Sequence, residues 1–143
     1  MTTFSGRCHC GNLQIVFETV FTSANLPLRA CRCCFCRAHG AVSAADPRGV
    51  VTISVTDPAQ LRHYRFGLGI TDFLVCACCG VYMAGVMEID GALYASINCN
   101  VLSMRKQLQR QPQAVDYEGE TIDQRRTRRR KHWTPTVFAG MRA

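Results

Sequence analysis

The sequence has no long apolar runs. None approaches the roughly 18 consecutive apolar residues that a membrane-spanning helix requires. The first residues also lack the basic-then-apolar pattern of a secretory signal, and the chain has no internal repeat and no low-complexity segment apart from one arginine run. These absences predict a soluble, cytoplasmic protein with no membrane partner.

The length and composition predict one folded domain over residues 1–143. The chain has 143 residues, of which 48% are apolar, which is enough for a hydrophobic core and too short for two ordinary domains. A formal net charge of +7 is unevenly distributed, with +1 over residues 1–104 and +5 over residues 105–131. All ten cysteines lie before residue 100. The sequence therefore divides into a thiol-rich body (1–104) and a basic C-terminal segment (105–143).

The cysteines form three clusters, and a reducing compartment favours metal binding by them over disulfides. The clusters are Cys8-His9-Cys10-Gly11, Cys31-Arg32-Cys33-Cys34-Phe35-Cys36 and Cys76-Ala77-Cys78-Cys79-Gly80. Zinc prefers four soft ligands at tetrahedral corners, which two closely spaced pairs can supply. The pair Cys76 and Cys79, followed by a glycine suited to a knuckle turn, fits with Cys8 and Cys10 as a closed structural site.

The middle cluster has an ambiguous register. Cys31 with Cys34 and Cys33 with Cys36 are both possible knuckles, and four ligands from six consecutive residues are difficult to close around one zinc. Three ligands, Cys31, Cys33 and Cys36, are easier to bring together. They leave a coordination position open, as in catalytic zinc sites. The alternative is a second structural zinc, closed by Cys34 or a histidine.

Most of the body is predicted to be β structure, because short β-rich runs alternate with turn signals. The Asp90-Gly91 pair predicts a tight hairpin. Alternation in the strand that follows places five residues on one buried face, namely Leu93, Ala95, Ile97, Cys99 and Val101. The expected strands are Leu13–Phe17, Val50–Val55, Leu61–Phe66, Ile70–Val75, Val81–Ile89 and Ala92–Val101.

Helix is expected only in the C-terminal quarter. A short helix is predicted over Ser103–Arg110, with Ser103 as its N-cap. Residues Gln124–Lys131 are either helical or loose, and any helix there ends at His132–Pro135. The single tryptophan, Trp133, is expected to anchor this segment to the body.

The cysteine pattern resembles the glutathione-dependent formaldehyde-activating enzyme family, which includes centromere-protein-V-like proteins. The matching motifs are Gly6-x-Cys8-x-Cys10-Gly11, Cys31-x-Cys33-x-x-Cys36 with Gly40 downstream, Cys76-x-x-Cys79-Gly80-Val81 and Ile97-Asn98-Cys99-Asn100-Val101-Leu102. The resemblance implies a tent-like arrangement of small antiparallel sheets stapled by zinc. It implies a structural zinc on Cys8, Cys10, Cys76 and Cys79, and a second, catalytic zinc on Cys31, Cys33 and Cys36.

The implied activity is that of a carbon–sulfur lyase with two zinc ions per chain. It would bind glutathione or a related thiol at the open zinc and add it to formaldehyde or another small aldehyde. Arg32, Arg37 and His39 lie beside the middle cluster and are candidates for a glutathione carboxylate. Three cysteines lie outside the family pattern, namely Cys34, Cys78 and Cys99, and the alternation favours Cys99 as a buried core thiol.

The basic run Arg125–Lys131 suggests an alternative function. Such a run can bind phosphate backbones, and the protein would then be a non-catalytic zinc-stapled adaptor for nucleic acid, or a thiol carrier. Against a nucleic-acid partner, the body is nearly neutral, and the acidic residues of 116–123 precede the run and can pair with it. A solvated segment, a bridge in a homo-oligomer, or an arginine site for an anionic substrate remain as further possibilities.

Overall fold

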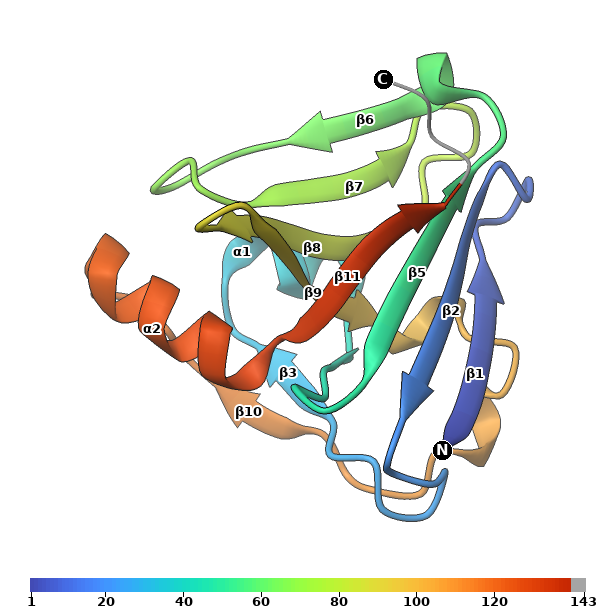
Figure 1. Cartoon of the computed structure of the whole chain (residues 1–143), viewed down its shortest axis with the longest axis horizontal. Coiled ribbons are helices and arrows are strands. Elements are labelled where there is room, and N and C mark those ends of the chain that lie inside the picture. Colours follow the sequence, from blue (N-terminus) through green and yellow to red (C-terminus); the bar gives the residue numbers. More distant parts are fainter. Residues whose placement is uncertain (140–143) are drawn as a thin grey trace.

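The computed structural model describes residues 1–139, and it confirms a mainly β fold (Figure 1). The strands are β1 (Thr2–Arg7), β2 (Leu13–Thr19), β3 (Arg29–Cys31), β4 (Ser43–Ala44), β5 (Val50–Val55), β6 (Leu61–Tyr64), β7 (Asp72–Cys76), β8 (Tyr82–Ile89), β9 (Ala92–Asn98), β10 (Gln113–Val115) and β11 (Thr134–Ala139). The helices are α1 (Cys34–His39) and α2 (Ile122–His132), with 3₁₀ turns η1 (Pro58–Gln60), η2 (Cys99–Val101) and η3 (Arg105–Gln107).

The strands form one branched sheet in which β9 is the shared member. One edge of β9 pairs with β8, which continues to β7 and β6. The other edge pairs first with β11 and then with β4, and from there the sheet continues to β5, β2 and β1 on one side and to β3 and β10 on the other. The pairs β3–β10 and β5–β11 are parallel and the rest are antiparallel, so the sheet is mixed rather than wholly antiparallel.

The hydrophobic core follows from the alternation of apolar residues along the strands. In β2, Leu13, Ile15 and Phe17 are at most 1% exposed, and they pack with Phe4 of β1 and Ile53 of β5. The middle of the alternating face is buried as predicted, because Ala95, Ile97 and Cys99 are fully buried, whereas Leu93 and Val101 at its two ends are only partly buried. This core fixes the strands from which both cysteine sites extend.

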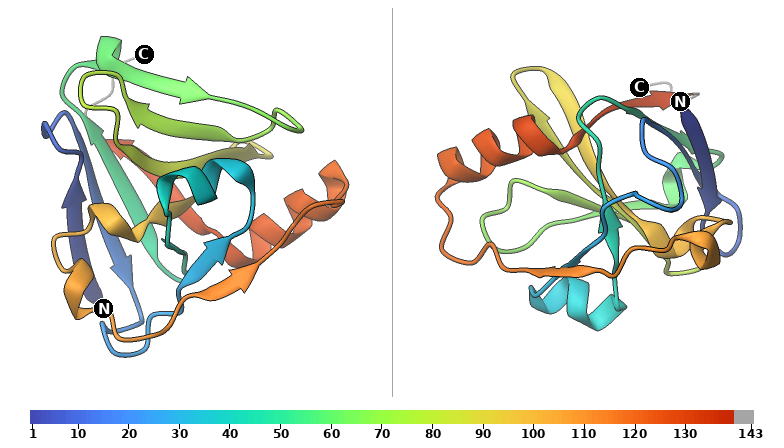
Figure 2. Two further views of the ribbon diagram at one scale, coloured as in Figure 1. Left: turned by 180° about the vertical axis from the view of Figure 1, so that it is seen from behind. Right: turned by 90° about the horizontal axis from the view of Figure 1, so that it is seen from below.

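Residues after 104 supply two strands of the sheet. Strand β11 lies between β5 and β9, and β10 lies beside β3. Between them, α2 projects at the side of the molecule opposite β1 (Figures 1 and 2). The helical alternative for Gln124–Lys131 is thus the observed one, and Trp133, directly after α2, is buried against Met87 and Ile89.

The helix predicted over Ser103–Arg110 is wrong. Only the single turn η3 forms there, because the segment packs along β1. The backbone N–H and the hydroxyl of Ser103 both donate to the Ser5 carbonyl, so Ser103 does not cap a helix. The approach is so close that a Cβ at Gly6 would lie 2.4 Å from the carbonyl oxygen of Val101. A tertiary contact therefore overrides the local helix preference.

Two other strand predictions and the predicted location of helix also differ from the structure. The last predicted strand stops at Asn98, whose side chain accepts from the Asn100 N–H and starts η2. The strands around Gly67-Leu68-Gly69 are shorter, because Arg65 binds Asp72 and the Gly69 carbonyl across a wider loop. Helix α1 lies outside the C-terminal quarter to which helix was confined.

Among residues 1–139, no helix has the length and apolar character needed to cross a membrane. The longest, α2, carries seven basic side chains between Arg125 and His132, counting that histidine.

A buried aspartate in the loop between β4 and β5 links strands β2 and β11. Asp46, which is 0% exposed, accepts from the Thr19 hydroxyl and from the N–H groups of Val20 and Arg48, while its own N–H donates to Thr134 in β11. Burial alone would raise the pKa of Asp46, but these donors and the charge of Arg48 together lower it below the usual value.

We expect Asp46→Asn to lower the free energy of unfolding by about 2 kcal/mol at pH 7, because the amide loses charge-assisted hydrogen bonds. The folded pKa is depressed, so this stability is present above the ordinary carboxyl pKa of 3.8 and disappears as the pH falls through the lower folded value. Urea unfolding at pH 7 and pH 3 measures the difference, with the exposed Asp123→Asn as control. An equal difference at both pH values would contradict this origin.

Candidate metal centres and the adjoining cavity

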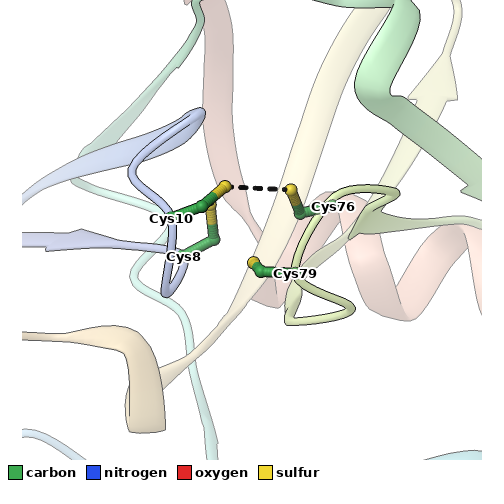
Figure 3. A group of neighbouring side chains, drawn as sticks. All are labelled: Cys8, Cys10, Cys76 and Cys79. Carbon is green, nitrogen blue, oxygen red and sulfur yellow. Dashed lines mark hydrogen bonds between the residues drawn. The ribbon is translucent and has the colours of Figure 1, made fainter.

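Four cysteine sulfurs meet between two turns (Figure 3). Cys8 and Cys10 lie in the connection from β1 to β2, while Cys76 ends β7 and Cys79 lies in the turn before β8. All four Sγ atoms lie within 4.8 Å of one another, with Cys8–Cys10 at 3.7 Å and Cys10–Cys76 at 3.5 Å. The structure therefore brings together the four residues predicted for the first site.

This geometry fits a tetrahedral zinc. Zn–S bonds of about 2.3 Å imply S···S edges of about 3.8 Å, close to the observed spacings, which are far too long for a disulfide of about 2.05 Å. Gly11 and Gly80 follow the two pairs with φ of 86° and 80°, as the knuckle turns require. The Leu13 N–H donates to Cys8 Sγ at 3.3 Å. The four thiols could hold a metal ion, compatible with zinc, with no ligand position left open.

The second cluster is built where β3 passes into α1. Cys31 ends β3, Cys33 is the N-cap of α1, and Cys36 lies in the first turn of that helix, with its N–H donating to Cys33 Sγ at 3.4 Å. The three sulfurs lie within 4.8 Å of one another. Within residues 1–139, no fourth cysteine, histidine or carboxylate joins this group, and Cys34 is exposed outside it.

The three thiols of the second cluster titrate together. A hydrogen bond from Cys36 lowers the pKa of Cys31 to about 5, aided by donors at Cys33 and the charge of Arg128. The same bond, with burial, raises the pKa of Cys36, and burial raises that of Cys33. In the absence of a metal, the hydrogen bonds from Cys33 and Cys36 therefore favour the thiolate form of Cys31 over that of its two neighbours. Metal binding would displace the remaining protons.

A cavity of about 710 Å³ opens beside the second cluster. Its walls come from the Cys31–Arg37 segment, the loop between β6 and β7, the β10–α2 connection and one face of α2. Residues of strands β3, β4, β7, β8 and β9 complete the lining. The residues used in the arguments below are Cys31, Cys33, Cys36, Arg32, Arg37, Phe66, Phe73, Tyr82, Tyr117, Glu120, Arg125, Arg128, Arg129 and Trp133.

Of the three residues beside the middle cluster that are candidates for a glutathione carboxylate, two line the cavity and one does not. Arg32 and Arg37 line it, whereas His39 does not and instead packs against Phe35 with ring centroids 4.6 Å apart. Phe35 also meets the ring of Tyr82 edge-on at 4.9 Å, and complete burial raises the pKa of that phenol well above its ordinary value. The aromatic groups thus form a rigid apolar support for α1.

The sequence offers the basic run of α2 as a possible site for an anionic substrate, but it does not select individual arginines as site residues. Arg125, Arg128 and Arg129 line the cavity, whereas Arg126 and Arg130 lie on the exposed face. The signal is present in the sequence, since spacings of three and four residues place the first three on one side of a helix. The sequence does not show what that side of the helix faces, so the spacing alone could not identify these arginines as site residues.

The three extra cysteines have different environments. Cys34 and Cys78 are exposed, and neither belongs to a metal-type group among the described residues. Cys99 is fully buried beneath β9, where burial raises the pKa of its thiol to about 12. The expectation of a buried Cys99 is confirmed.

The fold and the two clusters define a mainly β protein with two sets of cysteines that could hold metal ions. No protein-family model matches the chain, and no curated protein matches it. A crystal structure of a Rhodobacter sphaeroides protein, a structural-genomics target, is similar to it, with a TM-score of 0.55 and 27% sequence identity over 69% of this chain and 87% of that chain. That protein is described by its source alone, so the similarity supports the fold and assigns no activity.

We expect two zinc ions per chain by elemental analysis, and one after Cys36→Ser or Cys76→Ser. Cys76→Ser should also lower the free energy of unfolding by about 3 kcal/mol or more, because it breaks a buried site that joins two distant hairpins. Cys36→Ser should cost much less, since its cluster lies at the surface of a cavity.

The chain provides matched controls for both variants. Cys78→Ser and Cys34→Ser remove exposed thiols next to each site and should leave two zinc ions bound. One zinc in the unmodified protein, or loss of a zinc in either control, would contradict the assignment of ligands.

Proposed function

We propose that this protein is a zinc-dependent carbon–sulfur lyase-like enzyme that binds a small thiol beside Cys31, Cys33 and Cys36 and adds it to an aldehyde. The observation that carries the proposal is a three-thiol cluster, with no fourth ligand among residues 1–139, at the wall of a cavity of about 710 Å³. A structural metal needs neither an open position nor a cavity.

The resemblance in cysteine pattern suggests glutathione as the thiol and formaldehyde as one aldehyde. A bound zinc with three protein thiolates would lower the pKa of a thiol placed in its fourth position. In the addition, a sulfur–carbon bond forms, the π bond of the carbonyl group breaks, and the thiol proton ends on the carbonyl oxygen. The product is a hemithioacetal, and no oxidant or reductant is needed.

The residues of this chain would contribute binding and placement. Arg32 and Arg37 line the cavity on either side of Cys33 and Cys36, where each can pair with a carboxylate of a tripeptide thiol. Phe66 and Phe73 provide an apolar wall that excludes water from the reacting groups. Because the uncatalysed addition is already easy, holding the two reactants together is the main source of rate.

A thiol carrier that performs no chemistry is the alternative with the same site. The nucleic-acid alternative receives less support, because several cations of the Arg125–Lys131 run are engaged within the chain. Arg125 and Arg128 pair with Glu120, and Arg130 pairs with Asp90.

We expect the zinc-loaded protein to bind glutathione by isothermal titration calorimetry, and S-methylglutathione at least about tenfold more weakly, because the methylated sulfur cannot become a thiolate. Cys36→Ser should reduce glutathione binding to the level of the methylated analogue, and Cys34→Ser should not. Equal affinity for the two ligands would contradict a thiol bound at the cluster.

Turnover separates the enzyme from the carrier. NMR exchange measurements with glutathione and formaldehyde should give faster hemithioacetal formation with the unmodified protein than with Cys36→Ser. A rate equal to that of the protein-free solution, with glutathione still bound, would establish a carrier.

A further inference from the structure

Arg129 is a buried cation that has no anionic partner among residues 1–139. It is 6% exposed, and its guanidinium carbon lies 4.1 Å from the ring centroid of Trp133. One Nη donates to the Thr71 hydroxyl and to the Met87 sulfur, and the buried Nε has no hydrogen-bond partner. No carboxylate of residues 1–139 lies within ion-pair distance of Arg129.

Such a charge is costly to bury. Removing an unpaired cation from water is strongly unfavourable, and stacking on an indole offsets only part of that cost. Burial, followed by repulsion from Arg128 and Arg125, lowers the pKa of Arg129 to about 9, so the group is still cationic at neutral pH. Since Arg129 lines the cavity, its counter-charge can come from there.

The neighbouring arginines share one carboxylate. Glu120 accepts from Arg125 at 3.1 Å and from two nitrogens of Arg128 at 2.7 and 2.9 Å. The guanidinium carbon of Arg128 also lies 3.5 Å from the ring centroid of Tyr117. Two guanidinium groups of α2 therefore share one carboxylate while that of Arg129 pairs with none among residues 1–139, and all four groups line the cavity.

The excess of positive charge extends around the cavity. Its lining has six arginines and three carboxylates, the other two acids being Asp116 and Glu118, both exposed. A zinc ion on three thiolates would add a single negative charge, so the cavity would stay cationic with the metal bound.

The wall contributed by the β6–β7 loop and the start of β7 has the opposite character. Phe66 and Phe73 stack with centroids 4.8 Å apart, and Leu68 and Ile70 extend this apolar surface. A cavity of this volume accommodates a ligand much larger than formaldehyde.

We propose that the cavity is a binding site for a small carboxylate with an aromatic or apolar body. The carboxylate faces the arginines of α2, where it meets the charge of Arg129 and competes with Glu120 for Arg128. The apolar body lies on the wall of Phe66 and Phe73. In the unliganded protein, the carboxylate of Glu120 pairs with Arg128 in the place that the ligand carboxylate would take. Phe66 and Phe73 serve both proposals, but the arginines of α2 that hold the carboxylate are not needed for the proposed thiol chemistry. Variants of these arginines and of Cys36 therefore let the two proposals fail separately.

Trp133 reports on this site, because it is the only tryptophan of the chain and it stacks on Arg129. Titrating the full-length, zinc-loaded protein with 3-phenylpropionate should change its fluorescence saturably, with an affinity at least about tenfold above that of the neutral 3-phenylpropanol. Inorganic phosphate, which lacks the apolar body, should bind more weakly than the carboxylate.

Variants test the named contacts. Arg128→Gln should weaken carboxylate binding about tenfold, whereas Arg126→Gln, on the exposed face of the same helix, should not change it. Glu120→Gln should strengthen binding several-fold, because the internal competitor loses its charge. Circular dichroism of each variant confirms that α2 is retained.

Several results would overturn the site. In the unmodified protein, these results are no saturable binding of 3-phenylpropionate, equal affinity for 3-phenylpropanol, or phosphate binding as tight as that of the acid. In the variants, they are equal effects of Arg126→Gln and Arg128→Gln on carboxylate binding, or weaker carboxylate binding by Glu120→Gln. In Cys36→Ser, which removes the proposed thiol site, carboxylate binding should persist. Loss of glutathione binding alone therefore bears on the thiol proposal and not on this one.

Discussion

The approach of four sulfurs from two hairpins is the constraint on which the rest of the architecture depends. The connection between β1 and β2 and the turn between β7 and β8 are separated by more than sixty residues, yet their thiols approach within bonding distance of one metal ion. Cys8 and Cys76 are buried in the main core, so the site is continuous with the hydrophobic packing. It therefore ties together the two arms of the sheet that β9 joins, one containing β1 and β2 and the other β7 and β8.

The second cluster depends on this arrangement only indirectly. Its residues lie on β3 and α1, and β3 is held by β4 on one edge and by the parallel strand β10 on the other. Strand β10 then leads through Tyr117 and Glu120 into α2, which brings the arginines to the same cavity as the cysteines. A thiolate cluster and a row of guanidinium groups therefore face one space because two short parallel strands are paired.

The local parts of this design could be predicted from the sequence. The Asp90-Gly91 hairpin and the alternation in β9 depend on residues close together in the chain. The two cysteine pairs of the first site are also recognisable locally, because the members of each pair lie within four residues of each other. The pairing of β11 with β5 and of β10 with β3 could not be predicted, because parallel partners far apart leave no local pattern. The cavity and the role of Arg129 could not be predicted either, because the cavity is lined by segments that lie far apart in the chain. In the Ser103–Arg110 segment, the helix preference lost to hydrogen bonds with Ser5.

The position of β11 has a consequence for how the protein is made. This strand fills the space between β5 and β9, so residues 1–133 alone would present two unpaired strand edges in the middle of the sheet. During synthesis the nascent chain must therefore keep these edges from pairing with other chains until Thr134–Ala139 leave the ribosome. The four-cysteine site is complete much earlier, once Cys79 has emerged. Early zinc binding would hold the two hairpins together, so fewer chain conformations would remain when β11 inserts between β5 and β9.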